Sequence, residues 1–384
     1  MLLPASIEDY RSLAEKRVPR FLFSYLEGGS VEEITLRDNR DAWARKKLRQ
    51  FVLRDVSECD LAATLLGEKL SMPLVMAPVG LAGLYRRRGE VQAVRAAAAA
   101  GVRFCLSTVG LCSVEEVRAA TKAPFWFQLY MMRDRGIVKE LLSRAKAAQC
   151  SALVFTIDLA RIGIRYGDVR HGMTAQPTLK TRLARAADVL SHPRWLADVP
   201  LRGGPLVFGN LTEYVPKARH LEAFKTWVDS QFDPGLTWKD IEWLRRQWDG
   251  PILLKGILEP GDAQMAARMG IEGVVVSNHG GRQLDGAEAT ADALPRIVDA
   301  VADQLTLLVD GGIRYGNDII KARALGAHGV MIGRAWIWAL AARGEEGVRD
   351  VLRMLDNETR NSLGLMGISR LSDVNRDCLL HSRG

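Results

Sequence analysis

The chain of 384 residues lacks several features that would decide its class at once. No apolar run approaches the roughly 18 residues that a bilayer-spanning helix needs. The stretch Met1–Asp9 has no basic-then-apolar signal pattern, so we expect a cytoplasmic protein. The five cysteines are odd in number and scattered beside apolar runs, which predicts reduced core thiols rather than disulfides or a metal site.

Signals for nucleic-acid binding are also missing. The formal net charge is +8, yet there is no aromatic-basic stripe, no zinc-finger spacing and no basic tail. Small anions and an anionic membrane surface remain as partners for the excess of basic residues. With 48% hydrophobic residues, the chain can bury a large core and is not expected to be disordered.

Short apolar runs alternate with helical patterns from Met72 onward. Eight such runs predict strands, namely 74–76, 104–106, 125–127, 153–155, 252–254, 274–276, 307–309 and 330–332. The segments between them predict helices over 89–100, 113–120, 137–148, 240–247, 260–269, 292–302 and 317–325. Eight repeats with every strand apolar on both faces indicate an α/β fold, a (β/α)₈ TIM barrel.

The alternative architecture is a doubly wound open sheet. The first strand-to-helix turn, Ala77-Pro78-Val79-Gly80, lacks the three-glycine dinucleotide fingerprint, which counts against it. We therefore expect one barrel domain over residues 1–384. It would carry a helical extension over 1–60, opened by a capping box at Ser6, and a long insertion over 178–216 after strand four.

Polar residues follow the predicted strands, where the active sites of barrels lie. The residues that form this ring are Pro78, Gly80, Ser107, Thr108, Gln128, Tyr130, Thr156, Asp158, Lys255, Ser277, His279, Asp310, Gly311, Gly312, Gly333 and Arg334. The glycines after strands seven and eight, with Arg314 and Arg334, suit a phosphate held by backbone N–H groups and guanidinium groups.

The stretch Ser277–Asp285 places a base, His279, three residues from a fixed cation, Arg282. That pair suits an anionic substrate, because the arginine can hold a carboxylate while the histidine removes a proton. Lys255 admits two interpretations, a Schiff base of the aldolase type or a protonated group that stabilises negative charge on a flat cofactor. Tyr25 is either a core residue or a hydroxyl directed into the site.

The stretch Ser277–Asp285, with Asp310–Arg314 and Gly333-Arg334, resembles the FMN-dependent 2-hydroxy acid dehydrogenases and oxidases. Further matching stretches are Phe21–Phe23, Ala77–Leu81, Arg87–Ala93, and Phe232 through Asp240. The likeness covers nearly the whole chain and is greatest to bacterial quinone-linked L-lactate dehydrogenases, followed by mandelate dehydrogenase.

The resemblance implies a role for each matching residue. His279 is expected to be the base and Asp158 its carboxylate partner, while Tyr130 bonds the substrate hydroxyl. Arg165 and Arg282 are expected to clamp the substrate carboxylate with help from Tyr25. The residues expected around FMN are Pro78, Val79, Gly80, Ser107, Gln128, Thr156, Lys255, Ser277, Asp310, Gly311, Gly312, Arg314, Gly333 and Arg334. No metal is expected.

By the same resemblance, the chain oxidises an L-2-hydroxy acid and passes electrons to a quinone or another membrane acceptor. A homo-oligomer, a tetramer, at the cytoplasmic face of the inner membrane is implied. An oxidase that uses O₂, an FMN barrel isomerase and a Schiff-base aldolase are the competing functions. Two mechanisms of oxidation stay open. His279 removes either the α-proton, leaving a carbanion, or the hydroxyl proton while a hydride moves to the flavin, and both mechanisms need the same residues.

Two stretches bear on partners. Arg161, in Leu159–Arg165, stands where lactate dehydrogenases of this kind carry an uncharged, proline-containing segment, so it is either a solvated charge or a contact to a different substrate. The segment from Thr178 to Gly204 contains five basic residues and only two aspartates, and Trp195 and Leu196 are close to the basic residues in the sequence. This composition predicts peripheral contact with an anionic membrane, against the alternative of an active-site lid.

Overall fold

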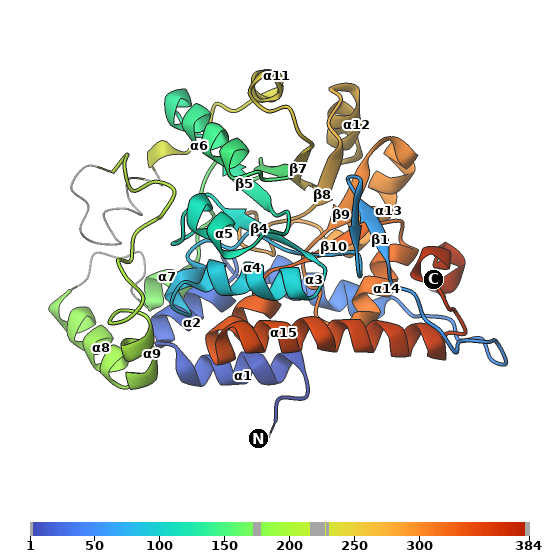
Figure 1. Cartoon of the computed structure of the whole chain (residues 1–384), viewed down its shortest axis with the longest axis horizontal. Coiled ribbons are helices and arrows are strands. Elements are labelled where there is room, and N and C mark those ends of the chain that lie inside the picture. Colours follow the sequence, from blue (N-terminus) through green and yellow to red (C-terminus); the bar gives the residue numbers. More distant parts are fainter. Residues whose placement is uncertain (1–2, 172–177, 216–226, 228–229, 381–384) are drawn as a thin grey trace.

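The computed structural model describes residues 3–171, 178–215, 227 and 230–380. Parallel strands close into a barrel in the order β10-β3-β4-β5-β6-β7-β8-β9 (Figure 1). These strands are β3 (Leu74–Met76), β4 (Arg103–Ser107), β5 (Trp126–Tyr130), β6 (Ala152–Thr156), β7 (Ile252–Ile257), β8 (Gly273–Val276), β9 (Thr306–Val309) and β10 (Gly329–Ile332). The (β/α)₈ barrel predicted from the alternating pattern is confirmed.

The strands are apolar on both faces because each separates two cores. Alternate residues such as Val75, Val154 and Val275 point into the barrel and form one buried cluster there. Their neighbours, such as Leu74 and Leu153, pack outward against the helices in a second and larger cluster. This double burial explains why the strands appear in the sequence as short apolar runs instead of alternating patterns.

Helices follow the strands close to their expected bounds. They are α4 (Gly89–Ala99), α5 (Val114–Ala120), α6 (Arg135–Ala147), α11 (Trp238–Gln247), α12 (Pro260–Arg268), α13 (Thr290–Val301) and α14 (Gly316–Ala324). Ser113 and Thr237 cap α5 and α11, each in a capping box with the acidic residue three positions on. The local cap chemistry thus sets where these helices begin.

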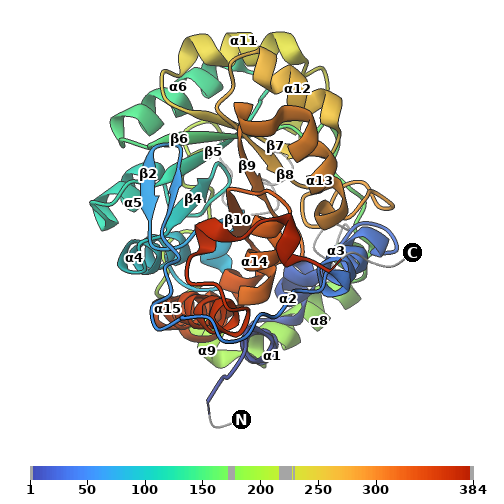
Figure 2. The same ribbon diagram turned by 90° about the vertical axis from the view of Figure 1, so that its right-hand side faces the viewer.

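An antiparallel hairpin that the sequence pattern did not reveal covers the N-terminal end of the barrel. It consists of β1 (Ala63–Leu65) and β2 (Glu68–Leu70) and faces the viewer in Figure 2. Its Leu65 and Leu70 join the cluster inside the barrel, and Glu68 pairs with Arg103 at the start of β4. The hairpin therefore closes this end, and the opposite end carries the polar ring.

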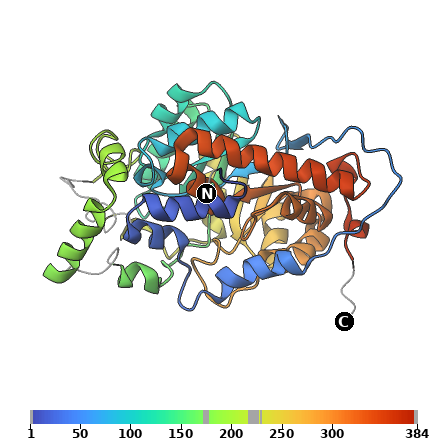
Figure 3. The ribbon, with the colours of Figure 1, turned by 90° about the horizontal axis from the view of Figure 1, so that it is seen from below.

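The N-terminal segment folds as α1 (Ile7–Arg17), α2 (Arg20–Glu27) and α3 (Ile34–Arg45), with the capping box at Ser6 that the sequence indicated. Helix α1 packs along α15 (Arg334–Leu365), and Figure 3 shows the two side by side. Helix α15, which the strand-counting argument missed, bends at Gly344, where φ is +65°. Only Gly333 separates its first residue from β10, so its N-terminus lies at the polar end of the barrel.

The chain after β6 first forms α7 (Tyr166–Arg170), and the insertion over 178–216 contains α8 (Leu179–Leu190) and α9 (Pro193–Asp198), at one edge of the molecule in Figures 1 and 3. Pro216, its expected last residue, lies outside the described residues. Trp195 was expected to sit with the basic residues at a membrane surface, and this is wrong. It is buried, with Nε1 donating to Leu84 O at 2.7 Å, because α9 packs against the barrel.

Within the described ranges, no helix has the length and apolar character that crossing a bilayer requires. All five cysteines are free thiols and four of them are buried, as the scattered spacing predicted. Burial raises the pKa of the Cys150 thiol to about 12, which keeps this thiol protonated and unreactive.

Candidate active site

A cavity opens at the C-terminal ends of the barrel strands, where the sequence predicted the site. The predicted residues that line it are Tyr25, Pro78, Val79, Gly80, Tyr130, Thr156, Arg165, Lys255, His279, Arg282, Asp310, Gly311, Gly312, Arg314, Gly333 and Arg334. Asp158, Ser107, Gln128 and Ser277 are absent from that wall and lie behind it, bonded to residues around the cavity.

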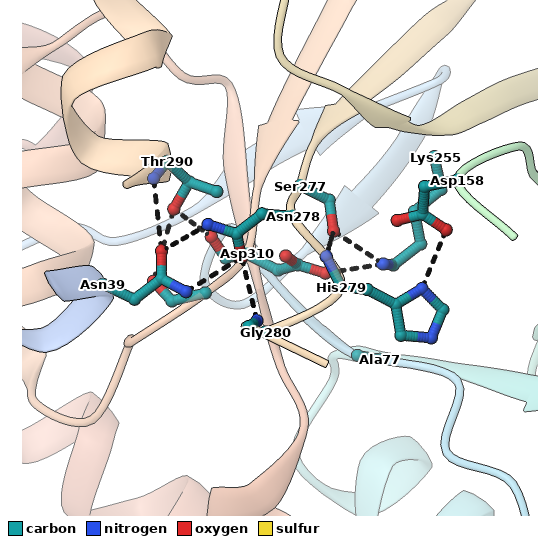
Figure 4. A network of polar contacts seen from close by, with 12 residues as sticks. Asn39, Ala77, Asp158, Lys255, Ser277, Asn278, His279, Gly280, Thr290 and Asp310 are labelled. Carbon is teal, nitrogen blue, oxygen red and sulfur yellow. Dashed lines mark hydrogen bonds and ion pairs between the residues drawn. The ribbon is translucent and has the colours of Figure 1, made fainter. Parts of the chain in front are cut away.

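His279 and Asp158 form a bonded pair at the centre of the site (Figure 4). His279 Nδ1 lies 2.8 Å from Asp158 Oδ1, and the other edge of the imidazole faces the cavity. Burial alone would raise the pKa of Asp158, but the charge and hydrogen bond of His279 and the charge of Lys255 hold it below its ordinary value. A carboxylate in this position stabilises the imidazolium that forms when the histidine accepts a proton.

The chain after β8 reaches this geometry through unusual backbone conformations. His279 has φ +57°, and Gly280 and Gly281 follow with positive φ. A Cβ on Gly281 would lie 2.6 Å from Leu36 N, so only glycine allows the loop to pass this close to α3. A left-handed histidine is uncommon, and such strained residues gather at functional sites.

Lys255 lies within β7, only 4% exposed, between two acceptors. Its Nζ is 2.9 Å from Asp310 Oδ2 and 2.8 Å from Ser277 Oγ. Burial would lower the pKa of Lys255, but the charges of Asp310 and Asp158 outweigh burial and raise it. The amine therefore keeps its proton, which favours the electrostatic role over a Schiff base.

Two arginines meet over one aromatic ring. The guanidinium carbons of Arg165 and Arg282 lie 5.4 Å and 5.0 Å from the centre of the Tyr25 ring. Arg282 Nη1 donates to the backbone carbonyls of Tyr25 and Gly28 at 2.8 Å and 2.6 Å. Tyr25 thus lies half-buried at the cavity wall, and two cations side by side over its ring suit a carboxylate.

The ends of β4, β5 and β6 carry polar groups on the same side. Gln128, fully buried, accepts from Ser107 Oγ at 3.0 Å, and Thr156 lines the cavity. Tyr130 packs edge-on against Phe232 with ring centres 5.2 Å apart. Burial raises the pKa of Tyr130, with Asp158 adding to the effect, so its hydroxyl stays protonated and able to donate.

Glycines and the start of a helix come together in the same cavity. Gly311, Gly312 and Gly333 line it, and so does Arg334, the first residue of α15, a combination that suits an anion. Burial lowers the pKa of Arg334 to about 9, helped by the charges of Arg282 and Arg314. Burial likewise lowers the pKa of Arg314 to about 10. Crowded, buried cations of this kind are what a phosphate would stabilise.

Comparison with known proteins identifies the family. The model of the FMN-dependent dehydrogenases matches residues 14–381. The chain belongs to this family. It is 50% identical over 378 residues to an L-lactate dehydrogenase of Caulobacter vibrioides, covering 98% of each chain. It is 48% identical over 379 residues to an L-lactate dehydrogenase of Acinetobacter baylyi, covering 99% of this chain and 98% of that one.

Among solved structures, the chain is similar to the monotopic membrane protein (S)-mandelate dehydrogenase, with a TM-score of 0.92 and 35% identity. The match covers 99% of this chain and 100% of that one. The protein is therefore an FMN-dependent dehydrogenase, and its cofactor is FMN.

The residues of the cavity fit this cofactor. Among the buried polar atoms around it that have no hydrogen-bond partner in the described residues are Gln128 Nε2, Asp310 Oδ1 and Arg314 Nε. An amide donor, a carboxylate acceptor and a guanidinium donor suit the polar edge of a flavin, a ribityl hydroxyl and a phosphate respectively. No group of three His, Cys, Asp or Glu side chains within the described ranges is arranged to hold a metal ion.

Some residues that shape the site were missed in the sequence. Asn39 of α3 exchanges amide hydrogen bonds with Asn278 at 2.8 Å and also accepts from Thr290, fixing the loop after β8 (Figure 4). Phe208 lines the cavity from the insertion, and Phe232 lines it from the chain before α11. Such residues carry no local signal, because they reach the site only through tertiary packing.

Arg161 does not line the cavity. Its side chain is exposed, and its carbonyl accepts from Gln283 Nε2 at 2.8 Å. Of the two interpretations of this residue, the solvated charge is the one that the geometry supports.

Proposed function

We propose that this enzyme oxidises an L-2-hydroxy acid, L-lactate in the first place, to the 2-keto acid. The observation that carries the proposal is the His279–Asp158 pair beside Arg165 and Arg282 in the FMN cavity. The two arginines bind a carboxylate, and the imidazole accepts a proton from the neighbouring carbon that carries the hydroxyl group, or from that hydroxyl. The names of the bacterial relatives at about 50% identity support lactate as the substrate.

Binding of the substrate would begin at the arginines. Arg165 and Arg282 hold the carboxylate, and the protonated Tyr130 hydroxyl donates to the substrate oxygen. Leu159, Ile162, Phe208 and Phe232 contribute the apolar lining and would surround the side chain of the acid. Orientation by two fixed cations places the α-carbon against the histidine, which lowers the entropic part of the barrier.

Proton transfer would then fall to His279. Its cavity-facing nitrogen takes the proton, and Asp158 stabilises the resulting imidazolium through the bond to Nδ1. FMN, when bound, supplies the two-electron acceptor for this oxidation. Lys255 keeps its positive charge at the cavity wall, where it can stabilise negative charge that develops during reduction.

An anaerobic bleaching experiment tests the proposal. The yellow holoenzyme should lose its flavin absorbance when L-lactate is added without air, faster than with L-mandelate. Slow recolouring in air, together with fast recolouring by a quinone in vesicles, is expected of a dehydrogenase. Fast recolouring in air would identify an oxidase instead, and no bleaching by any 2-hydroxy acid would contradict the proposal.

The finer proposal is that the acceptor is a membrane quinone and that α8 lies on the membrane. Leu179, Leu183 and Leu190 fall on one face of this helix and are 74%, 63% and 69% exposed. The opposite face, with Thr181, Arg185 and Val189, is half-buried toward the body, and Arg185 covers the Phe21 ring. An apolar stripe turned away from the protein suits an interfacial helix.

Charge on α8 supports an anionic surface. Lys180 and Arg182 flank the leucine stripe and are exposed. Each basic residue near such a surface is worth about 1 kcal/mol, and the leucines add apolar burial. The structurally similar monotopic membrane protein (S)-mandelate dehydrogenase supports attachment to a membrane surface, and we place this chain at the inner face of the cell membrane.

Co-sedimentation with anionic vesicles tests this location. The wild-type protein should sediment at low salt and less at high salt, while a variant with Leu179, Leu183 and Leu190 changed to Ser should stay in solution. A matched control changes three exposed leucines near the far end of α15, Leu53, Leu365 and Leu380, to Ser. Equal sedimentation of the α8 variant, or a soluble wild type at low salt, would contradict the proposal.

A homo-oligomer, a tetramer by family resemblance, completes the proposed assembly. Light scattering of the detergent-free holoenzyme measures it directly, and a monomeric mass would overturn it.

A further inference from the structure

A buried carboxylate that the proposed reaction does not use lies directly behind Arg165 and Arg282. Asp168 is 1% exposed, and its Oδ2 lies 2.7 Å from Arg165 Nε. The two residues stand three apart in the chain, and Asp168 N–H also donates to the Arg165 carbonyl at 3.1 Å. The turn that begins α7 therefore holds the arginine at both its backbone and its side chain.

The other arginines of the site are held differently. Arg282 bonds the carbonyls of Tyr25 and Gly28, and Arg334 bonds those of Leu26, Gly28 and Gly280. These partners are neutral and belong to the backbone. The contacts of Arg165, by contrast, include an acidic side chain, so a substitution of Asp168 changes both the local charge and one of the contacts that hold the guanidinium.

Two observations argue that Asp168 does more than stabilise α7. Its second oxygen, Oδ1, is buried without a hydrogen-bond partner among the described residues, which is an unfavourable arrangement for a carboxylate. Its charge also opposes the mutual repulsion of Arg165 and Arg282, which together with burial lowers the pKa of Arg282. A carboxylate retained at such a cost is typical of a functional site.

We propose that Asp168 is a positioning residue, which orients the Arg165 guanidinium toward the substrate carboxylate and lets two cations stand side by side. The proposal rests on the proposed oxidation of a 2-hydroxy acid. It assigns Asp168 no contact with the substrate. Asp168 affects substrate binding through Arg165 alone, so a substitution of Asp168 should have no effect once Arg165 is removed.

A double-mutant cycle tests it on the FMN-loaded enzyme. Asp168→Ala should raise KM for the hydroxy acid by about ten- to a hundred-fold, with a smaller change in kcat, because the clamp is misplaced. Asp168→Asn, which keeps the shape and loses the charge, should fall between wild type and Asp168→Ala. In an Arg165→Met background, either change at Asp168 should have no further effect on KM.

The controls distinguish a misplaced Arg165 from a loss of protein stability or of FMN binding. FMN affinity and the thermal midpoint are measured for each variant, and Asp168→Glu should recover part of the wild-type KM. Asp188→Asn, an acid-to-amide change in α8 outside the site, should leave KM unchanged. Effects of Asp168 and Arg165 that simply add, or an unchanged KM in Asp168→Ala, would overturn the proposal. Failure of the wild type to bleach with any 2-hydroxy acid would instead overturn the proposed function.

Discussion

Gly256 makes room for Asp158. A Cβ built on Gly256 would lie 2.5 Å from Asp158 Cβ and 2.6 Å from its Cγ. The pairing of β7 with β8 shifts register between Lys255 and Ile257, so Gly256 lies at an irregularity of the strand, with φ +114°. Bulges near active sites commonly redirect a side chain. Here the irregularity follows Lys255 directly, and the missing side chain of Gly256 leaves the space that Asp158, the partner of His279, occupies.

Gly256→Ala should therefore damage catalysis from within a barrel strand. The positive φ costs an alanine about 1–3 kcal/mol, and the methyl group displaces Asp158 from His279. We expect a lower thermal midpoint and a flavin-reduction rate that falls much further than FMN affinity. Stopped-flow bleaching at saturating substrate measures this rate. Gly261→Ala, in α12 where a Cβ meets nothing within 4 Å, is the matched control.

His279→Gln removes the proposed base while preserving a polar side chain of similar size. FMN should remain bound, because Arg314, Arg334 and Lys255 are untouched. Flavin reduction should slow by about 10²–10⁴-fold or more, the usual contribution of a positioned base. The single-turnover rate of bleaching is the measurement, and a rate within a few-fold of wild type would contradict the assignment.

Arg282→Lys keeps a positive charge but loses the planar fork. The lysine ammonium cannot bond the carbonyls of Tyr25 and Gly28 and a substrate carboxylate in the same way, so KM should rise by about tenfold or more. Added guanidinium should partly rescue Arg282→Ala. If wild type turned over a 2-hydroxy acid and its neutral amide equally well, the carboxylate clamp would not exist.

Much of this architecture was predictable because its signals are local. A strand buried on both faces has to be apolar throughout, so β3 and β8 stand out as Leu74–Met76 and Gly273–Val276. Barrel geometry then brings the polar residues after each strand to one end, and His279, Lys255 and Arg334 do line one cavity. Specific motifs identified the family that the comparisons show.

What escaped prediction depends on contacts between distant segments. The hairpin β1–β2 closes the barrel with Leu65 and Leu70, helped by the partly buried Leu66, too few residues to form a pattern. Trp195 lies in a basic segment whose composition is typical of a membrane anchor, but its Nε1 donates to Leu84 O inside the fold. Gly256 matters through Asp158, which follows a different strand of the barrel and cannot be read from the sequence next to the glycine.

Glu115 and Arg144 connect α5 to α6 by an ion pair whose contribution depends on pH. Arg144 Nε and Nη2 lie 2.7 Å and 2.8 Å from the two carboxylate oxygens. These hydrogen bonds lower the pKa of Glu115 to about 2, even though burial acts in the opposite direction. A carboxylate with a lowered pKa stabilises the fold above its unfolded value of about 4.3, and this contribution is lost as the pH falls toward 2.

Glu115→Gln should therefore lower the free energy of unfolding at pH 7 by about 1 kcal/mol, a modest amount because the glutamate is half-exposed and screened by solvent. The difference from wild type should shrink as the pH drops below about 4 and should also shrink in high salt. Urea midpoints across that pH range measure it, with the exposed Glu58→Gln as control. A difference that stays constant with pH would show that the glutamine disturbs packing, because only the loss of an ionised partner can follow the titration of Glu115.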